Sequence, residues 1–299
     1  MGKIAFVFSG QGDQYPGMGK ELAEKYSVAA QIYELCDKLR PGTSTQCFEG
    51  TDDELKETKN TQPCLFAMEL AAASVFKEKD VMPDAVAGFS LGEVVAATFS
   101  GIFDNKTGFR LVCKRGELMQ REAEKFDTSM AAVVKLTPEQ VQEVCNKYSD
   151  VYPVNFNCPG QITVSGLSSQ MADFFADVKA SGGRAIPLKV KGAFHSPFMK
   201  VAAEAFAEEL AGAEIKERTV TLYSNMTAEP YTDDVVGLMS KQICSPVQWE
   251  KIIRNMIADG IDTFIEIGPG KTLSNMIKKI NADVKAVSVT EYLAEVEVC

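Results

Sequence analysis

A Gly-x-Ser-x-Gly pentapeptide, Gly88–Gly92, constrains the fold of this 299-residue chain more than any other stretch. The apolar run Ala85–Ala87 precedes it and predicts a buried strand, and Glu93–Phe99 follows with small and apolar residues typical of a helix. A very tight turn from strand to helix brings the two glycine positions against neighbouring backbone and exposes the central serine at its tip. The motif therefore predicts an α/β fold in which Ser90 is an exposed nucleophile.

The residue after the serine has a predicted role of its own. The amide of Leu91 points out of the N-terminus of the predicted helix, where partial positive charge can meet a developing oxyanion. The alternative is a glycine-rich turn that holds a serine by chance. The strand before and the helix after favour the catalytic interpretation.

Charge and composition exclude several classes of protein. The net charge of -10 argues against nucleic acid as the main partner, and the single histidine excludes a histidine-rich metal site. Eight scattered cysteines without a Cys-x-x-Cys pair indicate reduced structural thiols. No apolar run reaches the roughly 18 residues of a membrane span, and Ile4–Phe8 is too short for a signal peptide. We expect a cytoplasmic protein.

Two further residues are candidates for the chemistry. His195 is the only imidazole that can activate Ser90, although a lone histidine is more often structural. In the predicted helix Asp104–Lys125, Arg115 falls inside the apolar arc and not on the polar face. A buried guanidinium needs an anion, so Arg115 forms a structural ion pair, extends past the core to solvent, or binds a substrate carboxylate.

Residues 128–191 have the pattern of an inserted module. The order is β-α-β-β-α-β, the ferredoxin-like pattern. The predicted strands are Ser129–Leu136, Val151–Asn155, Gln161–Ser165 and Arg184–Val190, and the helices are Gln140–Tyr148 and Ser168–Ser181. The sequence thus predicts a small domain over 128–191 inserted in a large, discontinuous domain over 1–127 and 192–299.

A basic stretch follows the module. No acidic residue occurs from Arg184 to Ala203, and the basic residues there are Arg184, Lys189, Lys191 and Lys200. In a chain of net negative charge this pattern indicates docking of phosphates or of an acidic carrier protein. The alternative is chance together with lysines that protect a strand edge.

Two glycine-rich loops fail as nucleotide sites. Gly10-x-Gly12 is followed by Tyr15 where a dinucleotide fingerprint needs glycine or alanine. The stretch Gly268–Thr272 imitates the end of a P-loop, but Ile265 stands where the first glycine belongs. A nucleotide-binding module is therefore not favoured, although the first loop can supply an amide to an active site.

Taken together, ordered motifs along essentially the whole chain resemble the malonyl-CoA:acyl carrier protein transacylase family. No single motif is as specific as the set. The motifs are Phe8–Gly12, Thr61–Pro63, Gly88–Glu93, Lys114–Gly116 with Met119 and Gln120, Asn155–Asn157, Pro159–Gln161, Ala193–Ser196, Gln242, Pro246–Trp249, Glu266 and Gly268–Gly270.

The resemblance implies an α/β-hydrolase-like large domain, an inserted ferredoxin-like domain and an active site in the cleft between them. The residue roles that it implies are Ser90 as nucleophile, His195 as base, Arg115 as the ligand of the malonyl carboxylate, the amides of Gln11 and Leu91 as oxyanion hole, Gln242 near the histidine with its backbone orienting the imidazole, and Asn157 in the cleft wall. It implies malonyl transfer from malonyl-CoA to acyl carrier protein through a malonyl-serine, for fatty-acid or polyketide elongation. No metal or redox cofactor is needed, and we expect a monomer.

One residue departs from the family and one agrees with it. The family usually has histidine before the nucleophile, where this chain has Phe89, so acyl selectivity or rate is affected there. Phenylalanine before the catalytic histidine, here Phe194, goes with malonyl over methylmalonyl. The alternative function is a serine thioesterase or esterase acting on acyl-CoA. In an ordinary α/β-hydrolase the histidine lies near the C-terminus, whereas about a third of this chain follows His195.

Overall fold

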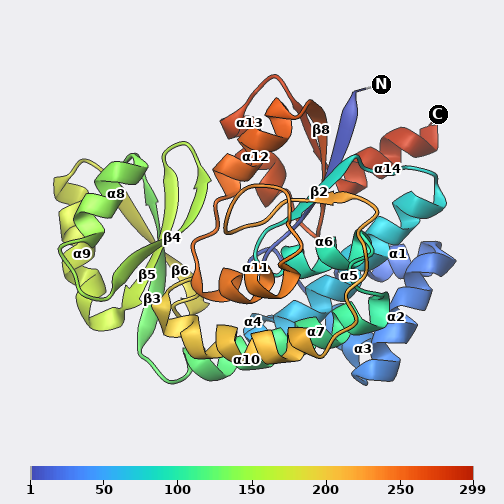
Figure 1. Cartoon of the computed structure of the whole chain (residues 1–299), viewed down its shortest axis with the longest axis horizontal. Coiled ribbons are helices and arrows are strands. Elements are labelled where there is room, and N and C mark those ends of the chain that lie inside the picture. Colours follow the sequence, from blue (N-terminus) through green and yellow to red (C-terminus); the bar gives the residue numbers. More distant parts are fainter. Residues whose placement is uncertain (1, 299) are drawn as a thin grey trace.

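Two separate sheets organise the chain, as Figure 1 shows. The structure is a computed structural model. It describes residues 2–298, but not the side chains of Lys191, Glu297 and Val298. The larger sheet is parallel, with strand order β7-β2-β1-β8-β9. The smaller sheet is antiparallel, with order β4-β5-β3-β6. The strands are β1 (Lys3–Phe8), β2 (Ala85–Gly88), β3 (Thr128–Val134), β4 (Val151–Cys158), β5 (Gln161–Leu167), β6 (Arg184–Lys191), β7 (Thr221–Leu222), β8 (Ile261–Ile267) and β9 (Lys285–Ser288).

Helices surround both sheets. They are α1 (Lys20–Lys25), α2 (Ser27–Leu39), α3 (Thr43–Glu49), α4 (Asp52–Lys56), α5 (Thr58–Glu78), α6 (Gly92–Phe99), α7 (Asn105–Ala123), α8 (Pro138–Cys145), α9 (Ser168–Ala180), α10 (Lys200–Ala211), α11 (Val235–Lys241), α12 (Trp249–Ala258), α13 (Thr272–Ile280) and α14 (Val289–Val298). Among residues 2–298, none of these helices combines the length and apolar character that crossing a membrane requires.

The parallel sheet is covered on both faces, which is why its strands read as continuous apolar runs. Alternate residues of β1 point to opposite sides. Phe6 and Phe8 enter the core formed with α2, α5, α6 and α7, whereas Ala5 and Val7 enter a second core formed with α12 and α13. The carboxyl ends of β1, β2 and β8 therefore meet at one buried edge, where the loops that follow them come together.

The small sheet has its own core. Apolar residues of β3 and β5, among them Val133 and Val164, pack with Phe174 of α9 and Val141 of α8. These two helices lie on the outer side of the molecule in Figure 1, so the other face of the sheet is directed toward the large sheet and its helices. The order β3-α8-β4-β5-α9-β6 follows the predicted β-α-β-β-α-β pattern, with element ends shifted by up to three residues.

The helices before β2 differ from the sequence-based expectation. The sequence predicts a polar helix over Asp52–Lys59 and an apolar helix over Cys64–Phe76. In the structure α4 ends at Lys56 and α5 already begins at Thr58, so Pro63 lies inside α5. The missing amide of a proline costs a helix one hydrogen bond. Here the helix is buried along most of its length, and this burial outweighs that cost.

Candidate active site

Ser90 lies at the turn between β2 and α6, with a left-handed backbone (φ 55°). The two glycines of the motif are required sterically. A Cβ on Gly88 would lie 1.9 Å from the carbonyl carbon of Gly92, and a Cβ on Gly92 would lie 2.4 Å from the carbonyl oxygen of Phe8. The turn is thus packed backbone against backbone, and it holds the serine at the carboxyl edge of the parallel sheet.

His195 reaches Ser90 from the segment that follows the small domain. Its Nε2 lies 2.7 Å from Oγ of Ser90, and its Nδ1 lies 2.9 Å from the carbonyl oxygen of Gln242. A carbonyl only accepts hydrogen bonds, so Nδ1 carries the proton and Nε2 accepts from the serine hydroxyl. Burial, together with the nearby positive Arg115, lowers the pKa of His195 to about 4, which keeps the imidazole neutral at physiological pH.

Arg115 of α7 is fully buried beside the serine. One terminal nitrogen donates to Oε1 of Gln62 (2.9 Å), and the other donates to Oε1 of Gln242 (2.7 Å) and to Oγ of Ser90 (3.2 Å). No carboxylate among residues 2–298 forms an ion pair with it. Burial lowers the pKa of Arg115 to about 10, so it remains a cation. The structural ion pair and the extension to solvent predicted as alternatives are therefore not what the structure contains.

The two candidate oxyanion donors are available. Within residues 2–298 the backbone amides of Gln11 and Leu91 donate no hydrogen bond to a protein group. Leu91 caps α6 with helical backbone angles, so its amide belongs to the N-terminus of that helix. Both residues line the cavity that contains Ser90.

A buried polar network extends behind the serine. Nε2 of Gln242 donates to the carbonyl oxygen of Ser90 (2.7 Å) and to Oε2 of Glu93 (2.6 Å). Oδ1 of Asn225 accepts from the amide of Ser90 (2.7 Å), and Nδ2 of Asn225 donates to the carbonyl of Gly88 (2.6 Å). Asn225 was not predicted. The available signal was its place just after the strand over 220–223, because polar residues that follow parallel strands meet at the same edge.

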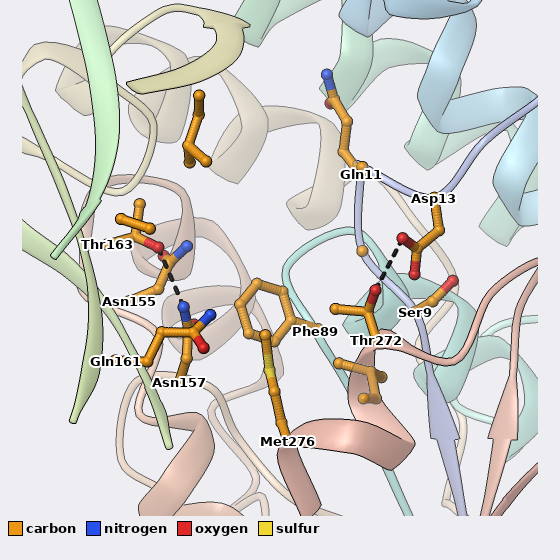
Figure 2. Close-up of a pocket in the computed structure, with 15 residues that line it drawn as sticks. Ser9, Gln11, Asp13, Phe89, Asn155, Asn157, Gln161, Thr163, Thr272 and Met276 are labelled. Carbon is orange, nitrogen blue, oxygen red and sulfur yellow. Dashed lines mark hydrogen bonds between the residues drawn. The ribbon is translucent and has the colours of Figure 1, made fainter. Parts of the chain in front are cut away.

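The serine opens into a narrow cavity of about 90 Å³, lined among others by Leu91, Met119, Phe194 and His195. A neighbouring cavity of about 190 Å³ contains Asn157, as Figure 2 shows. Asn157 therefore lines the cavity beside the serine and not the one that contains it; its Nδ2 donates to Oγ1 of Thr163 (3.1 Å). Gln11, Phe89, Asn155, Thr163 and Leu188 line both cavities.

Phe89 lines both cavities, and Figure 2 shows its ring in the wall of the larger one. Its ring meets the ring of Trp249 edge to face, with centroids 5.4 Å apart. The ring also lies against Gly10, where an added Cβ would come within 2.8 Å of its Cδ1. This residue therefore presents an apolar wall to the cavity that contains Ser90.

The basic residues of the stretch from Arg184 to Lys200 lie on two different elements, β6 and α10. Arg184 and Lys189 are exposed on β6, which is an edge strand of the small sheet. Lys200 begins α10. Its Nζ lies 3.9 Å from Oε1 of Glu204, so its charge is partly paired. Lys189 lines a further cavity together with Lys56 and Gln11, and Gln11 also lines the cavity that contains Ser90.

A family model for the acyl transferase domain matches residues 5–296. The chain belongs to the acyl transferase family. No group of three or more histidine, cysteine, aspartate or glutamate side chains among residues 2–298 is arranged to hold a metal ion.

Relatives within this acyl transferase family are similar over the whole chain. Malonyl CoA-acyl carrier protein transacylase of Bacillus subtilis is 40% identical and covers 97% of this chain and 94% of its own length. The crystal structure of malonyl CoA-acyl carrier protein transacylase from Clostridium perfringens is 35% identical, with a TM-score of 0.94 over 99% of this chain and 98% of that one.

A second similar structure contains two proteins. It is a type II PKS acyl-carrier protein in complex with its malonyl-transacylase. The match is 31% identical, with a TM-score of 0.91 over 96% of this chain and 94% of that one.

Proposed function

We propose that this acyl transferase moves a malonyl group from malonyl-CoA to the phosphopantetheine thiol of an acyl carrier protein. The observation that carries this proposal is Arg115, a buried cation that has no carboxylate partner among the described residues and donates to the serine Oγ. A planar guanidinium is suited to binding a carboxylate. An acyl group that carries its own carboxylate would supply the missing anion next to the nucleophile. The names of the relatives support the same substrate.

The first half-reaction would load the serine. Oγ of Ser90 attacks the thioester carbon while its proton passes to Nε2 of His195. The amides of Gln11 and Leu91 stabilise the tetrahedral oxyanion. The carbon–sulfur bond then breaks, and the imidazolium returns the proton to the sulfur of coenzyme A, which leaves as a thiol. Losing one oxyanion donor typically lowers the rate roughly 10²–10³-fold.

The second half-reaction would reverse these steps with a different thiol. The thiol of the carrier protein gives its proton to His195 and attacks the malonyl-serine ester, and Ser90 leaves with that proton. The carbonyl of Gln242 holds the imidazole by its Nδ1 proton through both halves. Asn157 lines the wall of the approach, and Phe194 limits branching next to the acyl carbonyl, in favour of malonyl over methylmalonyl.

The domain assignment belongs to this proposal. The sheet order β4-β5-β3-β6 supports a ferredoxin-like domain over 128–191, and the turn at Ser90 supports a hydrolase-like large domain over 1–127 and 192–299. The acyl carrier protein would approach along β6, near Arg184 and Lys189, with Lys191 and Lys200 in the same stretch of chain. The solved complex of a similar transacylase with its carrier protein supports such an acceptor.

The decisive experiment is intact-protein mass after brief incubation with malonyl-CoA, for the wild type and for Ser90→Ala. We expect the wild type to gain one malonyl unit, the variant to gain none, and the unit to move to an added phosphopantetheinylated carrier protein. An adduct that water removes while the carrier stays bare would indicate a thioesterase. Absence of an adduct from the folded wild type would contradict the proposed function.

A further inference from the structure

Glu93 is a buried carboxylate close to Ser90 whose side chain contacts neither the serine hydroxyl nor the imidazole of His195. It lies in the first turn of α6 and is fully buried. Its Oε1 accepts from the hydroxyl of Tyr231 (2.7 Å) and from the amide of Asn225 (3.1 Å), and its Oε2 accepts from Nε2 of Gln242 (2.6 Å). Burial raises the pKa of Glu93 to about 7, whereas the three donors and the charge of Arg115 favour its ionised form.

The hydrogen bonds of Gln242 have a fixed direction. Its Nε2 points to Glu93 and to the carbonyl oxygen of Ser90, so its Oε1 points to Arg115, 2.7 Å away. An ionised carboxylate only accepts and a guanidinium only donates. Reversing the amide of Gln242 would therefore place donor against donor at Arg115 and acceptor against acceptor at Glu93. The carboxylate, the carbonyl of Ser90 and the guanidinium together set the orientation of this amide, and the amide in turn holds Arg115 beside Ser90.

The charges of Glu93 and Arg115 lie on opposite sides of the Gln242 side chain. Glu93 supplies negative charge to Arg115 across one neutral side chain, and it does not touch the guanidinium. A carboxylate in direct contact would occupy the guanidinium in a bidentate pair. Because Gln242 lies between the carboxylate and the guanidinium, Arg115 stays charged and in place. Its Nε has no partner among the described residues. The guanidinium therefore keeps one buried donor that no group among the described residues uses.

We propose that Glu93 is a positioning residue that determines selectivity for carboxylated acyl groups, acting on Arg115 through Gln242. This inference rests on the proposed function, because it assumes that Arg115 binds the malonyl carboxylate. It separates two tasks that one ion pair could not perform together. Glu93 balances the buried charge, and Arg115 stays open to the substrate.

The test compares the kinetics of acyl loading from malonyl-CoA and from acetyl-CoA, which has no carboxylate. Glu93→Gln removes the negative charge and replaces one acceptor by a donor, so the hydrogen bonds that hold Gln242 and, through it, Arg115 are weakened. We expect the ratio of kcat/KM for malonyl-CoA to that for acetyl-CoA to fall about tenfold or more, mostly through a higher KM for malonyl-CoA. The constants for acetyl-CoA should stay within about threefold of wild type, because the Ser90–His195 contact does not involve Glu93.

Tyr231→Phe is the matched control. It removes one buried hydrogen bond to the same carboxylate but keeps the charge and the bond to Gln242. We expect this variant to be less stable with an unchanged ratio. A folded Glu93→Gln with the wild-type ratio would overturn the proposal, and so would a Tyr231→Phe whose ratio falls as far.

A second variant covers the case in which Glu93→Gln does not fold. Gln242→Glu places a carboxylate in direct contact with Arg115, and we expect the ratio to shift toward acetyl-CoA because the guanidinium is then occupied. A wild-type ratio in this variant would overturn the proposal. Failure of the wild type itself to load malonyl would instead refute the proposed function, so the two failures are distinguishable.

Discussion

Oγ of Ser90 and Nε2 of His195 lie 2.7 Å apart although 105 positions separate the two residues in the chain. Both residues have left-handed backbone angles, with φ of 55° and 60°. For residues other than glycine such angles cost about 1–3 kcal/mol each and persist only where the surrounding structure imposes them. At Ser90 the packed glycine turn imposes the angle, and at His195 the backbone amide is held by the carbonyl of Ile243 (3.1 Å). The fold thus holds strain at both members of the pair.

Removal of the imidazole should slow loading without abolishing binding. We expect His195→Ala to reduce the rate of malonyl-serine formation roughly 10²–10⁴-fold, the usual contribution of a positioned base. Quenched-flow mass spectrometry with malonyl-CoA measures this rate, and circular dichroism checks that the variant is folded. Loading at a rate close to wild type would show that another group takes the serine proton.

The reactivity of Ser90 should persist to unusually low pH. The pKa of His195 is lowered from 6.5 to about 4, mainly by burial, so the neutral base is lost only near pH 4. Because the folded value lies below the unfolded one, this histidine contributes stability that is present above pH 6.5 and is lost as the pH falls through 4. Labelling of Ser90 by an uncharged fluorophosphonate, followed against pH, should have its acid midpoint near 4. A midpoint near 6.5 would refute this assignment.

Arg115 should decide which acyl group is accepted. We predict that Arg115→Ala loses its preference for malonyl-CoA and still loads uncharged acyl groups, because the Ser90–His195 pair is unchanged. Arg115→Lys keeps the charge but lacks the planar fork, and it should recover only part of the preference. Incubation with a mixture of malonyl-CoA and acetyl-CoA, followed by intact-protein mass spectrometry, measures the acyl preference of both variants. Unchanged malonyl selectivity in a folded Arg115→Ala would exclude the assigned role.

The glycine turn should not tolerate a single added methyl group. Gly88→Ala places a Cβ 1.9 Å from backbone of Gly92, and we expect it to destabilise the protein by about 1–3 kcal/mol or more and to displace Ser90. Gly212→Ala is the control. Its Cβ would come no closer than 3.7 Å to other atoms, and its φ of -85° suits alanine. Urea unfolding measures the free energy of unfolding of both variants. Equal values for Gly88→Ala and Gly212→Ala would contradict the steric role of Gly88.

The exposed basic residues of β6, Arg184 and Lys189, should affect transfer to the carrier protein and not the chemistry at Ser90. We expect Arg184→Glu with Lys189→Glu to slow malonyl transfer to the carrier about tenfold at low salt, with a smaller effect at high salt. Loading from malonyl-N-acetylcysteamine, which has no phosphates, should be unchanged. Lys38→Glu on α2, far from β6 in Figure 1, makes a charge change of the same sign and serves as control. An equal effect of the control would refute a specific docking surface.

Local sequence patterns predicted the elements of the site more accurately than its surroundings. The strand and helix around Ser90, and the burial of Arg115 inside the apolar arc of its helix, follow from short-range periodicity and were predicted. The start of α5 at Thr58 was not, because burial of the helix outweighs the unfavourable proline. The segment that forms α3 likewise received no prediction.

By itself, the sequence determined the residue types and their local geometry: a serine at a glycine-walled turn, one histidine, and an arginine on an apolar helix face. These properties depend on neighbours within a few positions, so a linear pattern contains them. Only the tertiary structure decided that Arg115 meets no carboxylate within the described part of the chain. It also decided that Gln242 connects Glu93 with Arg115 and His195, and that Asn225 holds the amide of Ser90. Such contacts join distant segments of the chain, and parallel strands bring them together only when their carboxyl ends meet at one edge.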